Sequence, residues 1–204
     1  MPAIYHFTDV ENLPAILAAG ELRCHQMAAP AVDVGDPSIK SRRAVIDVTY
    51  GPGGKVCDYV PFYYAPRSPM LFSIKSDNVP DVSFDQRRLI YLTSSTEAAY
   101  AAGLACVFTD GNAATEFSEF HDDPSELAEV VDWPLMRVRY WANTPDDPDR
   151  RRRRMAEFLV HGALPLELVV EIAVYDRSVA SHVAGLLTAA GSTLSVAIRR
   201  GWYF

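Results

Sequence analysis

Apolar residues along this chain recur mainly in short runs that are bounded by turn-forming residues. These runs are rich in aromatic and β-branched residues, which fit a pleated, half-buried surface. They predict β-strands over residues 4–8, 58–64, 70–74, 88–93, 105–109, 157–162, 168–175 and 194–200.

Helical spacing of apolar residues is confined to fewer segments. Over residues 8–20 the apolar positions recur at three- and four-residue intervals, Thr8 and Glu11 have capping-box spacing, and Gly20 is placed to end the helix. Similar patterns predict helices over residues 94–103, 123–131 and 178–191.

The segment 26–57 contains proline and glycine and has no sustained periodicity. We expect a long connection with a helical turn around residues 39–46, and connections of this length are often functional lids or binding loops. Strands dominate and helices lie between them, without repeats or low-complexity tails. The pattern therefore predicts an α+β fold, a mixed sheet in one domain over residues 1–204.

Composition narrows the class of protein. The chain has 204 residues, of which 49% are hydrophobic and 22% are charged, and this is typical of a globular domain. No apolar run reaches the ~20 residues that span a bilayer, and the N-terminus lacks the pattern of a signal peptide. We therefore predict a cytoplasmic protein without membrane contact.

Several chemical classes are disfavoured. The three cysteines lie far apart, so we expect reduced thiols rather than disulfides or a metal site. The glycine-rich segment 51–55 lacks the spacing of a phosphate-binding loop and predicts a turn. No G-x-S-x-G or H-E-x-x-H motif occurs. Hydrolase and metalloenzyme interpretations are therefore weak, and we predict no metal.

The net charge of −7 argues against binding of nucleic acid through bulk electrostatics. Basic residues nevertheless cluster, most densely at Arg150–Arg154, just before Glu157. Arg153 and Glu157 are four residues apart, so they form a weak helical ion pair if this run is helical. From charge alone the run is a solvated face, and a role in chemistry stays open.

Two segments have features of a ligand site. His6 and Thr8 share one face of the first predicted strand, which is either a solvated edge or the wall of a pocket. In residues 58–72 three prolines interrupt an apolar run, which a central strand does not tolerate for long. Tyr63, Tyr64 and Arg67 there form either a rigid platform for a flat ligand or a packed corner. Asp110 and Asn112 are typical of the polar residues of a turn.

Several segments, taken in order, resemble the bacterial DarT toxins, which are DNA ADP-ribosyltransferases. They are "IYHFTDVENLPAILAAGEL", "VPFYYAPRSPML", "VFTDGNA", "RRMAEFLVHGALPLELV" and "IRRGWYF". The resemblance covers nearly the whole chain. It implies an ADP-ribosyltransferase-like fold, with a split, mainly antiparallel core of two sheets around an NAD cleft.

The resemblance also implies a reaction and a set of residues. ADP-ribose passes from NAD to a base of single-stranded DNA, with thymine as the expected acceptor, and nicotinamide is released. Glu157 resembles the catalytic glutamate, and Arg43 resembles the arginine that binds NAD and supports base modification, although Arg42 is adjacent. The residues that resemble the NAD-binding set are His6, Thr8, Asn12, Arg43 and Tyr63.

The DNA and protein partners follow from the same resemblance. We assign to DNA binding Tyr64, Arg67, Met70, Arg150, Arg151, Arg152, Arg153 and Arg154. A macrodomain antitoxin of the DarG type is the implied protein partner. Two alternatives stay open: transfer to guanine, RNA or protein, and a module that binds NAD or nucleic acid without catalysis.

Overall fold

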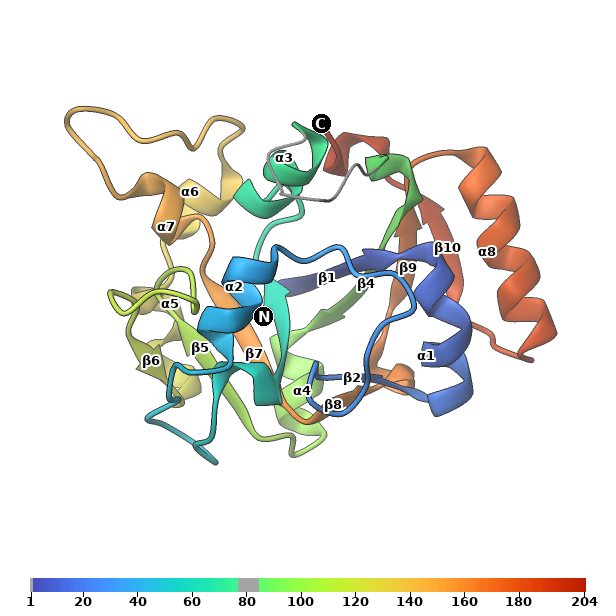
Figure 1. Cartoon of the computed structure of the whole chain (residues 1–204), viewed down its shortest axis with the longest axis horizontal. Helices are drawn as coiled ribbons and strands as arrows, with labels where there is room; N and C mark the ends of the chain where they lie inside the picture. The colour runs from blue at the N-terminus through green and yellow to red at the C-terminus, as the bar shows by residue number, and fades with distance from the viewer. Residues whose placement is uncertain (1, 77–84) are drawn as a thin grey trace.

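The computed structural model describes residues 2–76 and 85–204, and its centre is a sheet of eight strands in the order β10-β9-β4-β1-β3-β7-β5-β6 (Figure 1). The strands are β1 Ala3–Asp9, β3 Tyr59–Tyr63, β4 Leu89–Ser95, β5 Cys106–Thr109, β6 Phe120–His121, β7 Glu157–His161, β9 Glu171–Val174 and β10 Ser195–Ile198. Neighbouring strands are antiparallel except for the parallel pair β9 and β10. A second sheet pairs β2 Glu21–Arg23 with β8 Ala163–Pro165. The predicted α+β class is confirmed.

Short helices surround the sheet. They are α1 Leu13–Ala19, α2 Pro37–Arg43, α3 Pro69–Lys75, α4 Thr96–Ala101, α5 Leu127–Val130, α6 Trp133–Arg137, α7 Arg150–Arg153 and α8 Arg177–Ala189. Single 3-10 turns occur at Val10–Asn12, Val56–Asp58, Gln86–Arg88, Pro124–Glu126, Leu166–Leu168 and Arg200–Trp202. Helix α8 lies beside the β10 edge, whereas α5, α6 and α7 gather toward the opposite edge (Figure 1).

The large sheet is nearly divided in its middle. Strand β1 pairs with β4 along its whole length but meets β3 at a single position, Tyr5 opposite Tyr63. Pro61 lies in β3, and its lack of an N–H group is tolerated because the β1 side of β3 is unpaired there. The strand predicted over residues 58–64 therefore accommodates Pro61 and ends at Tyr63, before Pro66 and Pro69, and the gap opens a cleft between the two halves of the sheet.

Some expected elements differ from those observed. Residues 70–74 form part of helix α3 instead of a strand, because the Ser68 side chain accepts a hydrogen bond from the Leu71 N–H and Pro69 begins the helix. Apolar side chains at Leu71 and Ile74 then share a buried helical face. Helix α2 falls in the expected segment but ends at Arg43.

The termini of α1 show how local signals act. Gly20 ends the helix with a φ of 70°, as predicted, because only glycine adopts this left-handed conformation without strain. The expected cap at Thr8 was wrong: Asp9 caps the 3-10 turn Val10–Asn12 that precedes α1, with its side chain accepting the Glu11 N–H, and α1 itself starts after Asn12 without a side-chain cap. Thr8 is thus left in β1 with its hydroxyl facing the cleft. All three cysteines are unpaired thiols, as expected.

Candidate active site

The cleft beside the division of the sheet holds a cavity of about 710 Å³. Strands β1 and β3, helix α2, the segment 28–36 and the start of β7 form its walls. Residues of the predicted site that line it are His6, Thr8, Asn12, Arg43, Tyr63, Met70, Arg151, Arg152 and Glu157. Side chains far apart in the sequence therefore meet in one cavity.

A buried ion pair lies at the wall of this cavity. Arg43 Nη1 donates to Glu157 Oε2 at 2.8 Å, and the two side chains are only 14% and 2% exposed. Glu157 begins β7 directly opposite Tyr63. The other carboxylate oxygen, Oε1, accepts the Ala113 backbone N–H at 3.1 Å. Both oxygens are thus held in place, one by the guanidinium and the other by a backbone N–H group.

Arg43 rather than its neighbour Arg42 reaches the glutamate. Arg42 Nε instead donates to the Ser38 carbonyl in α2 at 3.4 Å. The second amino group of Arg43, Nη2, is buried and has no partner within the described part of the chain. A buried donor left unpaired costs free energy, so this group is available to a ligand.

His6 presents a neutral imidazole to the cleft. Its Nδ1 donates to the Pro61 carbonyl at 2.8 Å, across the gap between β1 and β3. Burial lowers the pKa of His6 from its ordinary value of 6.5 to about 4, against the contribution of this hydrogen bond and aided by nearby Arg43. Nε2 is therefore unprotonated near neutral pH and can accept a hydrogen bond.

Asn12 holds the long segment in place. Its Nδ2 donates to Thr8 Oγ1 and to the Val32 carbonyl, both at 2.8 Å, and its Oδ1 accepts the Val32 N–H at 2.9 Å. The amide is thus fully engaged within the protein. Asn12 shapes the cavity wall by tying the segment 28–36 to β1.

Tyr63 forms an aromatic wall. Its ring stacks on Phe7 with centroids 6.2 Å apart, and its hydroxyl contacts Met70 Sδ at 3.5 Å. Burial raises the pKa of Tyr63, so the phenol stays protonated. Met70, assigned to DNA from the sequence, lies with Tyr63 in the cavity.

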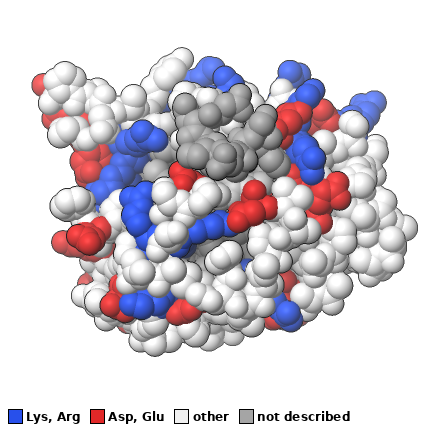
Figure 2. All heavy atoms as spheres, viewed as in Figure 1, with Lys and Arg blue, Asp and Glu red and all other residues white. Residues whose placement is uncertain are grey.

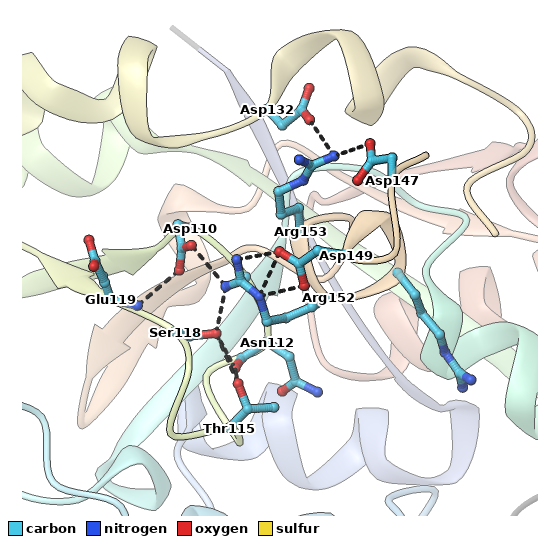
Figure 3. A network of polar contacts seen from close by, with 12 residues as sticks. Asp110, Asn112, Thr115, Ser118, Glu119, Asp132, Asp147, Asp149, Arg152 and Arg153 are labelled. Atoms are coloured by element: carbon cyan, nitrogen blue, oxygen red, sulfur yellow. Dashed lines mark hydrogen bonds and ion pairs between the residues drawn. The ribbon is translucent and has the colours of Figure 1, made fainter. Parts of the chain in front are cut away.

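The arginine run is built into the fold. Arg152 donates to both carboxylate oxygens of Asp149, to Asp110 Oδ2 at 2.8 Å and to Ser118 Oγ at 3.2 Å (Figure 3). Arg153 bridges Asp147 and Asp132 (Figure 3). The arginine run is therefore not a solvated surface, and its five side chains are not all available to bind DNA.

The other three arginines of the run differ in their surroundings: two make hydrogen bonds within the protein, and one is exposed. Arg154 is 4% exposed and donates to the carbonyls of Leu135 and Arg67. Arg150 donates to the Tyr140 carbonyl. Arg151 is exposed and lines the cavity, and its side chain makes no hydrogen bond or ion pair with residues 2–76 and 85–204. Of these five arginines, Arg151 is the one whose side chain is exposed at the cavity.

Two other residues assigned to DNA lie away from the cavity. Tyr64 is 6% exposed and packs edge-on against Trp133 in the core, on the opposite face of the sheet from Tyr63. This placement does not support stacking of a DNA base on Tyr64. The Arg67 guanidinium lies over the Phe204 ring, 4.4 Å from its centroid.

The loop between β5 and β6 is the part of the site that sequence reasoning missed. It supplies the Ala113 N–H to Glu157, and Thr109 Oγ1 accepts the Glu157 N–H while donating to the Gly111 carbonyl. Asp110 and Asn112 form a turn, as predicted. The sequence could not reveal the contact of this loop with Glu157, because the donor is a backbone N–H group and does not depend on the type of residue.

Basic side chains flank the cleft on the face shown in Figure 2. They gather over α2, which carries Lys40, Arg42 and Arg43, and over the region of α7. The described residues contain no group of three or more His, Cys, Asp or Glu side chains placed to hold a metal ion. No helix within that part of the chain is long and apolar enough to cross a membrane.

Known proteins resemble this chain over nearly its full length. A family model described as "DarT: ssDNA thymidine ADP-ribosyltransferase, DarT" matches residues 5–204. A DNA ADP-ribosyl transferase of Thermus sp. (strain 2.9) is 38% identical, and the match covers 98% of this chain and 95% of that protein.

Solved structures agree. The structure of Thermus sp. 2.9 DarT in complex with ADP-ribosylated ssDNA has a TM-score of 0.93 and 36% identity, covering 100% of this chain and 96% of that one. The same protein in complex with NAD+ has a TM-score of 0.88 and 35% identity, covering 100% and 98%. The ADP-ribosyltransferase-like fold expected from the sequence is confirmed, and this chain belongs to the DarT family of ssDNA thymidine ADP-ribosyltransferases.

Proposed function

We propose that the cleft binds NAD and that Glu157 and Arg43 are the catalytic pair for transfer of ADP-ribose to thymidine in single-stranded DNA. The observation that carries this proposal is the buried Arg43–Glu157 ion pair on the wall of the 710 Å³ cavity. The family of the chain supplies the reaction, with NAD as co-substrate.

The reaction requires a carboxylate beside the ribose. The bond between the ribose carbon and the nicotinamide nitrogen breaks, its electron pair leaves with nicotinamide, and positive charge develops on the ribose as in glycoside cleavage. Glu157 stabilises that charge through its carboxylate oxygens. Because Arg43 and the Ala113 N–H already fix both oxygens, little reorganisation is needed in the transition state.

Arg43 acts on the acceptor base or on the pyrophosphate. The thymine ring nitrogen forms the new bond to the ribose carbon, and the proton that it loses passes to the solvent. Arg43 stays protonated, so it cannot take that proton, but its unpartnered Nη2 can stabilise the anionic base. His6, with Nε2 as acceptor, and the Tyr63 ring supply a polar and a flat contact for the nicotinamide end of NAD.

The single-stranded state of the acceptor follows from the same chemistry. In a duplex, the thymine ring nitrogen is paired and stacked, and exposing it costs a few kcal/mol. A macrodomain antitoxin that reverses the modification stays a prediction from the family resemblance, as does action in the cytoplasm.

The test uses purified protein, NAD and oligonucleotides that differ only in base composition, each offered single-stranded and annealed. Mass analysis should find one ADP-ribose on thymidine-containing single strands and none on thymine-free strands. Transfer to guanine, RNA or protein, or NAD binding without transfer, would overturn the assignment in favour of the alternatives above. Equal transfer to the duplex would contradict the argument from base pairing.

A further inference from the structure

A second, shallow pocket of about 270 Å³ is lined largely by arginines. Its walls are formed by Pro66, Arg67, Met136, Arg137, Val138, Arg139 and Arg154. None of these arginines makes an ion pair with a carboxylate of the described residues, in contrast to Arg152 and Arg153 nearby. In a chain of net charge −7, positive charge is therefore concentrated here without compensation.

Two of the guanidinium groups are held in the wall of this pocket. Arg154 is 4% exposed, its two amino groups donate to backbone carbonyls, and its Nε is buried without a partner among the described residues. Arg67 also has a buried, unpartnered Nε. Burial lowers the pKa of Arg154 to about 10, with a further contribution from Arg67. An anion beside this pair would offset a charge that the fold leaves unpaired.

The other two arginines, Arg137 and Arg139, have exposed side chains that can contact a ligand. Arg137 ends α6, and Arg139 follows it in the connection to α7. Tyr140, next in the chain, is 78% exposed, and the Arg139 guanidinium lies 5.8 Å from its ring centroid. Arginines beside an exposed aromatic ring are the combination that binds single-stranded nucleic acid, by pairing with phosphate and stacking on a base.

The pocket lies at the same end of the sheet as the catalytic pair. Arg67 follows Tyr63, the last residue of β3, and Arg154 precedes Glu157, the first residue of β7. Tyr63 and Glu157 face each other across these strands. The pocket is therefore placed where nucleotides that flank a thymidine in the cavity would pass the end of the sheet.

We infer that Arg67, Arg137, Arg139 and Arg154 form a binding site for a backbone phosphate of the DNA strand, outside the NAD cavity. This inference rests on the proposed function and locates a part of its substrate site. Buried Arg154 and partly buried Arg67 set the charge of the site, and Arg137 and Arg139 donate to the phosphate oxygens. Tyr140 stacks on an adjoining base.

The test replaces the exposed pair, because changing Arg154 or Arg67, which are packed into the protein, would disturb the fold. Variants R137Q, R139Q and R137Q/R139Q are compared with R177Q, which removes an exposed charge on α8. Binding of a fluorescent thymidine-containing oligonucleotide is measured over a series of salt concentrations. Loss of one phosphate contact should reduce the log–log salt slope by about 0.7 for single strands, and the double variant should bind more weakly than wild type at low salt.

NAD affinity and the rate of transfer at saturating DNA should be unchanged in these variants. If wild type transfers ADP-ribose to DNA but R137Q/R139Q has the affinity and salt slope of R177Q, the phosphate site is wrong while the proposed function stands. Weakened NAD binding in the double variant would instead assign the arginines to the NAD pyrophosphate and overturn the inference. Failure of wild type to modify DNA, with NAD bound, would refute the proposed function itself.

Discussion

Replacing Arg152 with glutamine should slow transfer without weakening DNA binding. Sequence reasoning placed this residue on DNA, whereas the structure places it between Asp149, Asp110 and Ser118 (Figure 3). Through these contacts it anchors the loop whose Ala113 N–H donates to Glu157. Glutamine is too short and too poor in donors to bridge the two carboxylates.

The size of the effect can be worked out from the bonds that Arg152 makes. Without its guanidinium, two carboxylates have no charged partner in a region where Arg152 is 19% exposed, so the free energy of unfolding should fall by about 1–3 kcal/mol. Removal of a preorganised donor at a reacting centre costs about 10²–10³ in kcat. Because Ala113 keeps its N–H group and only its position loosens, we expect kcat to fall about 10- to 100-fold.

Gly111 reinforces this expectation. A Cβ atom at Gly111 would clash with the Arg152 guanidinium, so the loop backbone lies directly against that side chain. Movement of Arg152 therefore displaces the segment that continues to Ala113. An R152K variant keeps the positive charge but not the planar set of guanidinium donors. Compared with R152Q, it should regain more of the wild-type stability than of the wild-type kcat.

The assay is steady-state transfer to a thymidine oligonucleotide, with kcat and KM determined separately, together with DNA binding and thermal unfolding. The matched control is R151Q, which removes the exposed neighbour in the same helix. We expect R152Q to lower kcat and R151Q to raise KM for DNA. The reasoning is refuted if R152Q, at temperatures where it is folded, keeps the wild-type kcat and raises only KM for DNA.

Two further predictions concern the NAD side of the cleft. Because His6 binds a proton only near pH 4 in the fold but near its ordinary 6.5 when unfolded, the unfolded state binds more protons between these values. The free energy of unfolding should therefore fall as the pH is lowered from 6.5 to 4, and H6Q should show less of this fall in denaturant titrations; an identical pH dependence would contradict it. Asn12→Ala removes the hydrogen bonds to Thr8 and Val32. NAD affinity should therefore drop several-fold, while kcat at saturating NAD changes little. Wild-type NAD affinity in calorimetry would exclude this role of Asn12.

The sequence predicts well which segments form strands and which residues lie in the cleft. It predicts less well which groups each of those residues contacts. Strand runs such as 157–162 combine apolar periodicity with turn signals, and they were located correctly. Residues 70–74 were misassigned because a short apolar run fits either a strand or a helix, and the cap at Ser68 decided the outcome. Pro61 lies in a predicted strand, but the one-position pairing of β1 with β3 that accommodates it is a tertiary feature, which the sequence does not show.

The arginine run shows why charge patterns are hard to interpret from sequence. Consecutive like charges indicate a solvated or nucleic-acid-binding face only when the fold brings no carboxylates to them. Here the partners of Arg152 and Arg153, including Asp110 and Asp132, come from segments whose approach depends on the whole fold. The opposite holds for Arg67 and Arg137, which are far apart along the chain but share one pocket without a carboxylate.

The central claim is that Glu157 performs the chemistry of transfer rather than building the site. The most direct test is E157Q, which keeps the size of the side chain and an acceptor for the Ala113 N–H but removes the charge. NAD affinity by calorimetry and transfer to a thymidine oligonucleotide by mass analysis are measured on the same folded protein. We expect NAD binding within a few-fold of wild type and a loss of transfer of about 10³-fold, since a preorganised charge at the developing cation is removed. Transfer by E157Q at close to the wild-type rate, with NAD bound, would contradict it.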